Sequence, residues 1–159
     1  MGAFRLAREL EISRNQAQEY IDQYFARYPS VLDYFDRLRN DMDILGYVET
    51  LFGRRRYKQD IDSSGRDYGY SERSLLNAPI QGTAAEIIKK AMINLNQSLA
   101  KYSQNARMVL QVHDELIIET SKKLAEPVFA LVVREMENAV KLSVPLKVEA
   151  RVSQRWGGE

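Results

Sequence analysis

Apolar residues recur every three or four positions through the first third of the chain, the spacing of helices that each bury one face. Ser13 and Gln16 have the spacing of a capping box, which predicts a helix start beside Ser13, and Pro29 should end that helix. A second helix should follow Pro29 and stop at Gly46, and a shorter one should cover residues 3–10. The first third is therefore predicted to be helical.

The pattern changes after Gly46. Alternation over residues 47–57 predicts a small ribbon, and the polar, glycine-containing stretch 60–70 predicts a loop. A long helix is expected over residues 71–101, with a kink or irregular turn where Pro79 and Gly82 interrupt it. Its expected buried positions are Leu76, Ile80, Ala84, Ile87, Ile88, Ala91, Leu95 and Leu99.

Two apolar runs, residues 107–112 and 115–120, flank a polar pair, as in a β-hairpin with a tight turn. A helix should begin between residues 121 and 126 and reach residue 142. Residues 146–153 then alternate in polarity, which is typical of a half-buried strand. The predicted fold class is α+β, with long helices packed on a small antiparallel sheet made of the hairpin and the C-terminal strand.

The tip of the predicted hairpin carries the most informative side chains. His113 is the only histidine, and Asp114 and Glu115 are adjacent carboxylates at the same rigid point. Asp also tolerates the left-handed backbone that a tight turn can require. Carboxylate oxygens and bound phosphates are the ligands that Mg²⁺ prefers. The alternative is an ordinary solvated turn, and these three residues alone do not exclude it.

A second group of polar residues lies on the predicted long helix. Arg73, Asn77 and Gln81 are four residues apart, so they form one stripe along a helix. All three side chains can donate hydrogen bonds. The DNA minor groove offers acceptors at equivalent places on every base pair, so such donors would test the shape of a duplex without reading its sequence. The alternative is a stripe that faces solvent.

Composition limits the kinds of site and partner. The absence of cysteine and the single histidine exclude thiolate and multi-histidine metal sites, so a metal would be held by oxygen. The net charge is +1, so a charged partner would be recognised through local patches, such as Arg54, Arg55, Arg56 and Lys58. No apolar run approaches the roughly 20 residues of a membrane span, and no signal-peptide pattern is present. We expect no membrane partner and a cytoplasmic location.

Four stretches, in one order along the chain, resemble DNA polymerases of family A, the DNA polymerase I family. They are QEYIDQYFARYP at residues 18–29, YVETLFGRRRY at 47–57, ERSLLNAPIQGTAAEIIK at 72–89 and QVHDE at 111–115. The resemblance covers essentially the whole chain. It implies that residues 1–46 correspond to the distal fingers and residues 47–159 to the C-terminal part of the palm.

The same resemblance implies template-directed nucleotidyl transfer with two Mg²⁺ ions, on primer–template DNA and deoxynucleoside triphosphates, in DNA replication and repair at the bacterial nucleoid. Asp114 would be a catalytic metal ligand, Glu115 an assisting charge beside it, and His113 a contact to the primer terminus. The minor-groove contacts would be Arg73, Asn77 and Gln81. Weaker candidates for contacts to the DNA backbone are Arg54, Arg55, Arg56 and Lys58.

The chain also departs from the family pattern. It has no Asp-Tyr-Ser-Gln type of motif, which carries a second metal-binding aspartate, and no Arg…Lys…Phe-Gly-Tyr pattern, which belongs to the nucleotide-binding fingers helix. Thumb and exonuclease regions are missing as well. The resemblance therefore implies a C-terminal fragment that does not polymerise DNA alone. Such a fragment would expose a sheet edge or apolar face, and we expect it to self-associate.

Two alternative functions remain open from the residues. The sequence of residues 6–13, which precedes a predicted helix, resembles that of a helix-turn-helix motif. Such a motif would suit a stand-alone nucleic-acid-binding module. The following helix, however, offers Gln16, Gln18, Glu19 and Asp22 rather than basic residues. The other alternative is a hydrolase that binds a metal through Asp114 and Glu115, but no third ligand and no base can be identified for it.

Overall fold

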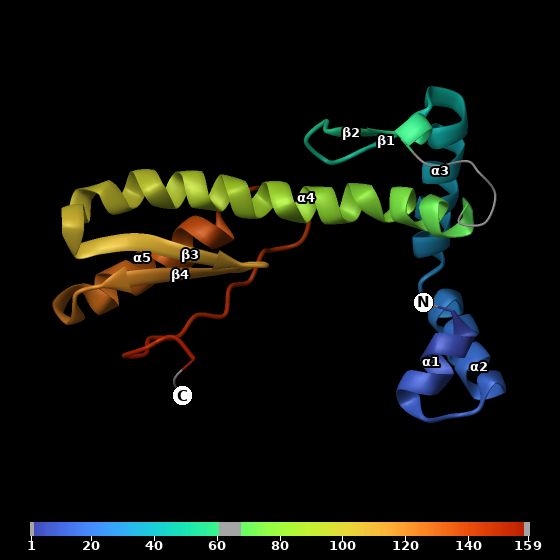
Figure 1. Ribbon diagram of the computed structural model, residues 1–159, viewed down its shortest axis with the longest axis horizontal. Coiled ribbons are helices and arrows are strands. Elements are labelled where there is room, and N and C mark those ends of the chain that lie inside the picture. Colours follow the sequence, from blue (N-terminus) through green and yellow to red (C-terminus); the bar gives the residue numbers. More distant parts are fainter. Residues whose placement is uncertain (1, 61–67, 158–159) are drawn as a thin grey trace. The chain divides into compact units, whose positions relative to one another are not determined.

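The computed structural model describes residues 2–60 and 68–157, and they form two compact units that divide between Pro79 and Ile80 (Figure 1). The predicted α+β class is confirmed, since long helices accompany two small antiparallel sheets, β1–β2 and β3–β4. The division falls inside α4 (Tyr68–Leu99), so the first turns of that helix belong to one unit and the remainder to the other.

The first unit begins with α1 (Ala3–Leu10), α2 (Arg14–Arg27) and α3 (Pro29–Leu45), as predicted. The capping box forms: the Gln16 amide donates to Ser13 Oγ over 3.2 Å, and the Ser13 amide donates to Gln16 Oε1 over 3.1 Å. Pro29 is the first residue of α3, where its missing N–H and fixed φ are tolerated. Gly46 ends α3 with φ of 76°, a conformation that suits a glycine.

The ribbon follows directly. Strands β1 (Tyr47–Glu49) and β2 (Arg55–Tyr57) pair antiparallel, and a 3₁₀ turn (Lys58–Asp60) follows. The core of this unit joins α3, the ribbon and the start of α4, and its buried members are Leu38, Met42, Val48, Leu75 and Leu76. The helical hairpin of α1 and α2 contributes little to a core, because Ala17 is its only buried residue among those described.

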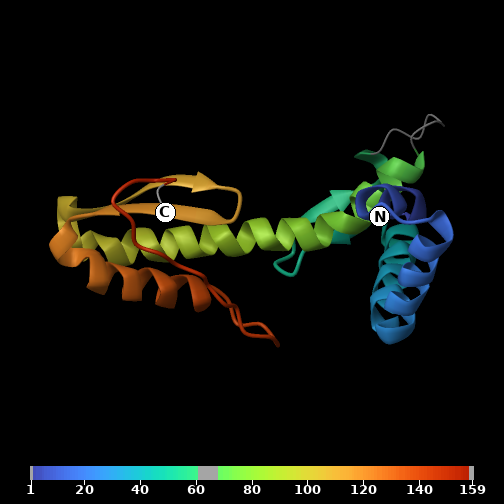
Figure 2. The same cartoon turned by 90° about the horizontal axis from the view of Figure 1, so that it is seen from below.

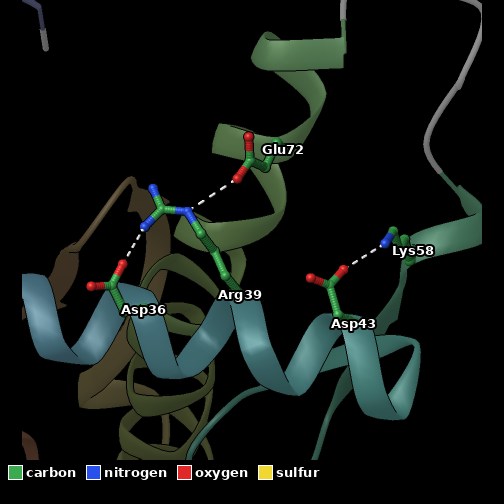
Figure 3. Close-up of polar contacts among 5 residues, drawn as sticks. All are labelled: Asp36, Arg39, Asp43, Lys58 and Glu72. Carbon is green, nitrogen blue, oxygen red and sulfur yellow. Dashed lines mark hydrogen bonds and ion pairs between the residues drawn. The ribbon is translucent and has the colours of Figure 1, made fainter.

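Ion pairs connect α3 to the two elements packed on it (Figure 3). Arg39 Nε lies 3.1 Å from Glu72 Oε1 of α4, and its Nη1 lies 2.8 Å from Asp36 Oδ1 one turn back on α3. Lys58, just beyond the ribbon, lies 2.7 Å from Asp43 Oδ1. These pairs are largely exposed, so each adds little stability; the Arg39–Glu72 pair is the one that connects α3 to α4.

The second unit contains the remainder of α4, a 3₁₀ segment (Ala100–Asn105), the hairpin and α5 (Ala125–Glu137). The hairpin strands are β3 (Ala106–Val112) and β4 (Glu115–Thr120), within one residue of their prediction. The hairpin and α5 both lie along the C-terminal half of α4 (Figure 2). The buried residues that join them are Leu99, Ala106, Val128 and Leu131.

The predicted strand at 146–153 is wrong. That segment forms no strand, and neither β3 nor β4 pairs with a third strand among the described residues. An alternating pattern becomes a strand only if a neighbour satisfies its backbone groups. Here the Val148 amide instead donates to Glu137 Oε1 over 3.3 Å. The preceding helix also ends earlier than predicted, at Glu137 rather than 142, where the Asn138 side chain donates to the Arg134 carbonyl over 2.7 Å and competes with further helix.

The long helix differs from its prediction in its buried face. It begins at Tyr68 and continues through Pro79, which is itself buried. Ile80 is 51% exposed and Ala84 is also exposed, contrary to prediction. Residues 80–90 include no buried side chain. Of the predicted loop 60–70, residues 61–67 lie outside the described residues. No helix in the described ranges has the length and apolar character to cross a membrane.

Candidate functional site

The hairpin turn consists of His113 and Asp114, between the paired residues Val112 and Glu115. His113 has φ of 54°, so the left-handed residue of the turn is the histidine and not the aspartate that the sequence suggested. Histidine is among the residues enriched in that region. The side chains of residues 113–115 are exposed, and none makes a hydrogen bond or ion pair with another described residue. The turn therefore presents an imidazole and two carboxylates to solvent from one short, defined backbone segment.

Several contacts hold this hairpin in place. Arg107 Nη2 and Glu119 Oε2 form a cross-strand ion pair of 2.8 Å on its outer face, while Ala106, Met108 and Ile118 pack into the core on the inner face. A register shift between Met108 and Leu110 leaves Val109 as an extra residue, and such bulges increase the local twist of a strand. Nearer the tip, Gln111 Nε2 donates to the His113 carbonyl over 2.9 Å.

The donor set at the tip is compatible with Mg²⁺ but is small. Asp114 and Glu115 offer the carboxylate oxygens that this ion prefers. Within residues 2–60 and 68–157, no group of three or more Asp, Glu, His or Cys side chains is arranged to hold a metal ion. The tip could therefore contribute ligands to a shared metal site, and the described residues do not complete one.

The polar stripe lies on α4. Arg73, Asn77 and Gln81 are all exposed, and their side chains make no hydrogen bond with another described residue. At about 3.6 residues per turn, the stripe faces away from the buried side of the helix, which carries Leu75, Leu76 and Pro79. The Glu72–Arg39 pair fixes the turn of α4 at which the stripe starts. Three donors are thus displayed along one helix face, and no acceptor among the described residues competes for them.

The basic run after β1 is placed differently, because its side chains have protein partners. Arg55 Nε lies 2.9 Å from Glu49 Oε2, and the Arg55 guanidinium lies 4.3 Å from the centre of the Tyr47 ring. The hydrogen bond to Glu49 raises the pKa of Arg55 above its ordinary value. Arg56 donates to the Ser74 carbonyl over 3.5 Å, Lys58 pairs with Asp43, and Arg54 also has a partner. These cations contribute to the fold of the ribbon.

Sequence reasoning missed two of these features. Gln111 lies in one of the four stretches that resemble family A polymerases, but no role was predicted for it. A glutamine two residues before a tight turn can reach the turn carbonyl, and this position was the signal for such a role. The pairing of Glu49 with Arg55 was also missed, although a β1–β2 register in which these residues face each other predicts it.

Similarity to known proteins identifies the family of this chain. Residues 1–158 match the sequence model of DNA polymerase family A. The DNA polymerase I of Pseudomonas aeruginosa is 47% identical over 157 residues, covering 98% of this chain and 17% of that protein. The DNA polymerase I of Caldicellulosiruptor bescii is 47% identical over 154 residues, covering 96% of this chain and 18% of that protein. The chain thus spans less than a fifth of the length of these curated relatives.

A solved structure is similar in three dimensions. The POL domain of Pol1 from M. smegmatis, in complex with a DNA primer-template and dNTP, has a TM-score of 0.81 and 44% sequence identity. The similarity covers 92% of this chain and 26% of the other. Both parts of the chain therefore have counterparts in a protein whose fold is known.

Proposed function

Because the chain belongs to DNA polymerase family A, we propose that it carries the primer-terminus side of the active site of a template-directed DNA polymerase. The observation that carries this proposal is the hairpin tip, where His113, Asp114 and Glu115 are exposed together on a two-residue turn. A nucleotidyl-transfer site needs carboxylates at a fixed position that nucleic acid can approach. A hairpin anchored in a core at its far end and exposed at its tip meets that need.

In this proposal each tip residue has a separate role. Asp114 is the metal-coordinating carboxylate, Glu115 supplies a neighbouring negative charge, and His113 contacts the primer terminus. The chemistry that a bound pair of Mg²⁺ ions supplies is activation of the primer 3′-hydroxyl and stabilisation of the leaving pyrophosphate. The contribution of this chain is to hold its two carboxylates at one place on a stiff support and to leave their oxygens free of protein donors.

The stripe of Arg73, Asn77 and Gln81 is proposed to contact the minor groove of the primer–template duplex. Its exposure and its lack of partners among the described residues support this role. The backbone candidates Arg54, Arg55, Arg56 and Lys58 have weaker support, since binding a phosphate would compete with the partners that they already have. We propose them as secondary contacts only.

Membership of the family also suggests a role for each part of the chain. We propose that residues 1–46 act as the distal fingers and residues 47–159 as the C-terminal part of the palm, in an enzyme that works in DNA replication and repair in the bacterial cytoplasm, at the nucleoid. The complete reaction also requires a second catalytic aspartate and a triphosphate-binding fingers helix, and neither motif occurs in these 159 residues.

The isolated 159-residue chain should therefore not extend a primer. One carboxylate pair does not suffice to hold two Mg²⁺ ions, and no triphosphate clamp accompanies it. The measurement is a primer-extension assay with the chain purified free of host polymerase. Extension that the wild-type chain supports and the Asp114→Ala chain does not would refute this expectation.

In a complete polymerase that carries this sequence, Asp114→Ala should lower the single-turnover incorporation rate by orders of magnitude and leave DNA affinity nearly unchanged. Glu149→Ala, which removes an exposed carboxylate of the C-terminal segment, is the matched control and should incorporate normally. A wild-type rate in the Asp114→Ala enzyme would remove Asp114 from the mechanism and with it the proposed function of the hairpin tip.

A further inference from the structure

The peptide bond between His113 and Asp114 joins the two turn residues, beyond the end of the β3–β4 ladder. Val112 and Glu115 are the last paired residues, so the carbonyl of His113 and the amide of Asp114 lie beyond the ladder. Among the described residues that are not glycine, only Glu11 and His113 have positive φ, so φ of Asp114 is not positive. His113 is therefore the one residue of this two-residue turn with positive φ.

Positive φ is uncommon in residues other than glycine, and here histidine adopts it. Rotation of the peptide plane between the two turn residues changes ψ of His113 and φ of Asp114 together. That rotation would change the backbone of Asp114 and therefore the direction in which its carboxylate leaves the hairpin.

The contact from Gln111 acts on this peptide plane. Its Nε2 donates to the His113 carbonyl over 2.9 Å, so the carbonyl is held towards the Gln111 side chain. Rotation of this peptide plane would move the carbonyl away and break the hydrogen bond. Gln111 lies within β3, where the ladder fixes its own backbone opposite Leu116, so it is a stable point from which to hold the turn.

We propose that Gln111 is a positioning residue: its amide holds the His113–Asp114 peptide in the observed orientation and so sets the direction of the Asp114 carboxylate. The effect on catalysis rests on the proposed function of the tip, whereas the effect on the turn does not. An exposed hydrogen bond of this kind corresponds to a change of about three- to tenfold in the balance between two arrangements.

The effect of Gln111 on the conformation of the turn is tested by NMR on the 159-residue chain. In the observed turn φ of Asp114 is not positive; rotation of the peptide would make it positive and bring the amide proton of Asp114 closer to its own Hα. Gln111→Met removes the donor with little change in shape and should strengthen the cross-peak between these two protons. Gln111→Lys retains a donor and should preserve the wild-type pattern, and Gln97→Met, on the exposed surface of α4, is the matched control. An unchanged turn in Gln111→Met would overturn the proposal.

The catalytic half is tested by single-turnover incorporation in a complete polymerase that carries this sequence. Gln111→Met should lower the rate at saturating nucleotide by about three- to tenfold, with DNA affinity unchanged, and Gln111→Lys should restore most of it. A rotated turn with an unchanged rate, or a loss that Gln111→Lys does not restore, would overturn the positioning role. Asp114→Ala in the same series separates the two ideas: if it has no effect, the proposed function fails, while the NMR result on Gln111 stands by itself.

Discussion

At the scale of single residues, exposure and pairing separate the cations and donors that DNA could use from those that the protein already uses. Arg55 lies between Glu49 and the face of Tyr47, and Lys58 is bonded to Asp43, although both are prominent in the basic run. Arg73 belongs to no such cluster in the sequence, yet it is exposed and makes no hydrogen bond or ion pair with another described residue. The first surface to test by mutation is therefore the stripe on α4.

Loss of a hydrogen-bond donor from the stripe should weaken incorporation or DNA binding to a similar extent on every template sequence. In a complete polymerase, Arg73→Ala or Gln81→Ala should lower incorporation or DNA binding by about 1–3 kcal/mol for each lost contact. The minor-groove acceptors N3 and O2 occur at equivalent places on all four base pairs, so the loss should not depend on base identity. The measurement is single-turnover incorporation on matched primer ends in several sequence contexts.

The same variants should respond differently to a mismatched primer end, because a mismatch displaces the acceptors that the stripe contacts. Extension past a mismatch should therefore change by a different factor from extension of a matched end. Gln97→Ala, which removes an exposed amide from the opposite side of the same helix, is the control. Strong dependence on base identity, or no effect on either end, would show that the stripe is only a solvated helix face.

Glu135 should give the second unit a measurable dependence on pH. The hydrogen bond from Arg134, at 2.8 Å, and a further one from Ser98 hold the pKa of the Glu135 carboxyl below its ordinary value. A lowered pKa in the folded state adds stability above the ordinary pKa, and that stability is lost as pH falls through the lowered value.

In Glu135→Gln this contribution is absent, so the urea midpoint of the variant should fall less than that of the wild type between neutral and acidic pH. The contribution of the ionised Glu135 carboxyl to the free energy of unfolding should be below about 1 kcal/mol, since Arg134 is largely exposed. Glu149→Gln, outside the helices, serves as the control. Equal pH dependence in wild type and Glu135→Gln would contradict the assignment of this carboxyl.

At the scale of elements, the ribbon depends on a hydroxyl in its turn. Thr50 is 8% exposed, and its Oγ1 accepts from the amides of Arg54 at 3.1 Å and Phe52 at 3.4 Å. Thr50→Val keeps the shape but removes the acceptor, and it should destabilise the first unit by about 1–2 kcal/mol. Urea unfolding followed by circular dichroism measures this loss, and faster hydrogen exchange at the Arg54 amide would locate it. Thr50→Ser retains the hydroxyl and should behave nearly as the wild type; equal losses in both variants would exclude the hydroxyl as the cause.

Elements with local signals were predictable from the sequence, and elements that depend on distant partners were not. The capping box at Ser13, the stop at Gly46 and the hairpin strands all follow from residues close in the chain, and all formed as predicted. The prediction of a strand at 146–153 was wrong because an alternating pattern does not show whether a neighbouring strand exists. The prediction that Ile80 is buried was wrong because a helical pattern shows which face is apolar but not where along the helix another element covers it.

The candidate site was predictable to a similar extent. The residues of the tip and of the stripe were identified from their types and spacing, and their exposure agrees with a binding role. The left-handed position in the turn fell on His113 rather than Asp114; both residues tolerate that conformation, so their types in the sequence do not decide between them. The partners of the basic run required the three-dimensional structure, since Asp43 and Ser74 are distant in sequence from the residues that they bind.

At the scale of the whole molecule, the second unit has an apolar surface with no described partner. Met108 and Ile118 pack into the core, so by register the neighbouring Ile117 and its cross-strand partner Leu110 face outwards. Leu110 is 42% exposed and the bulged Val109 is 48% exposed. The hairpin is also a sheet of two strands, each of which has an edge without a described strand beside it. Exposed edges and apolar patches of this kind promote association between chains.

We therefore predict that the 159-residue chain self-associates in a concentration-dependent way through the outer face of the hairpin. Leu110→Lys places a charge at the centre of that face and should shift the population towards monomer, because pairing two copies would then bury an unpaired ammonium group. Val152→Lys changes an exposed valine of the C-terminal segment, 64% exposed, and is the matched control that should leave association intact. Static light scattering over a range of concentrations measures the mass of all three chains. A strict monomer at high wild-type concentration would exclude association, and equal dissociation in both variants would show that the contact does not involve the hairpin face in particular.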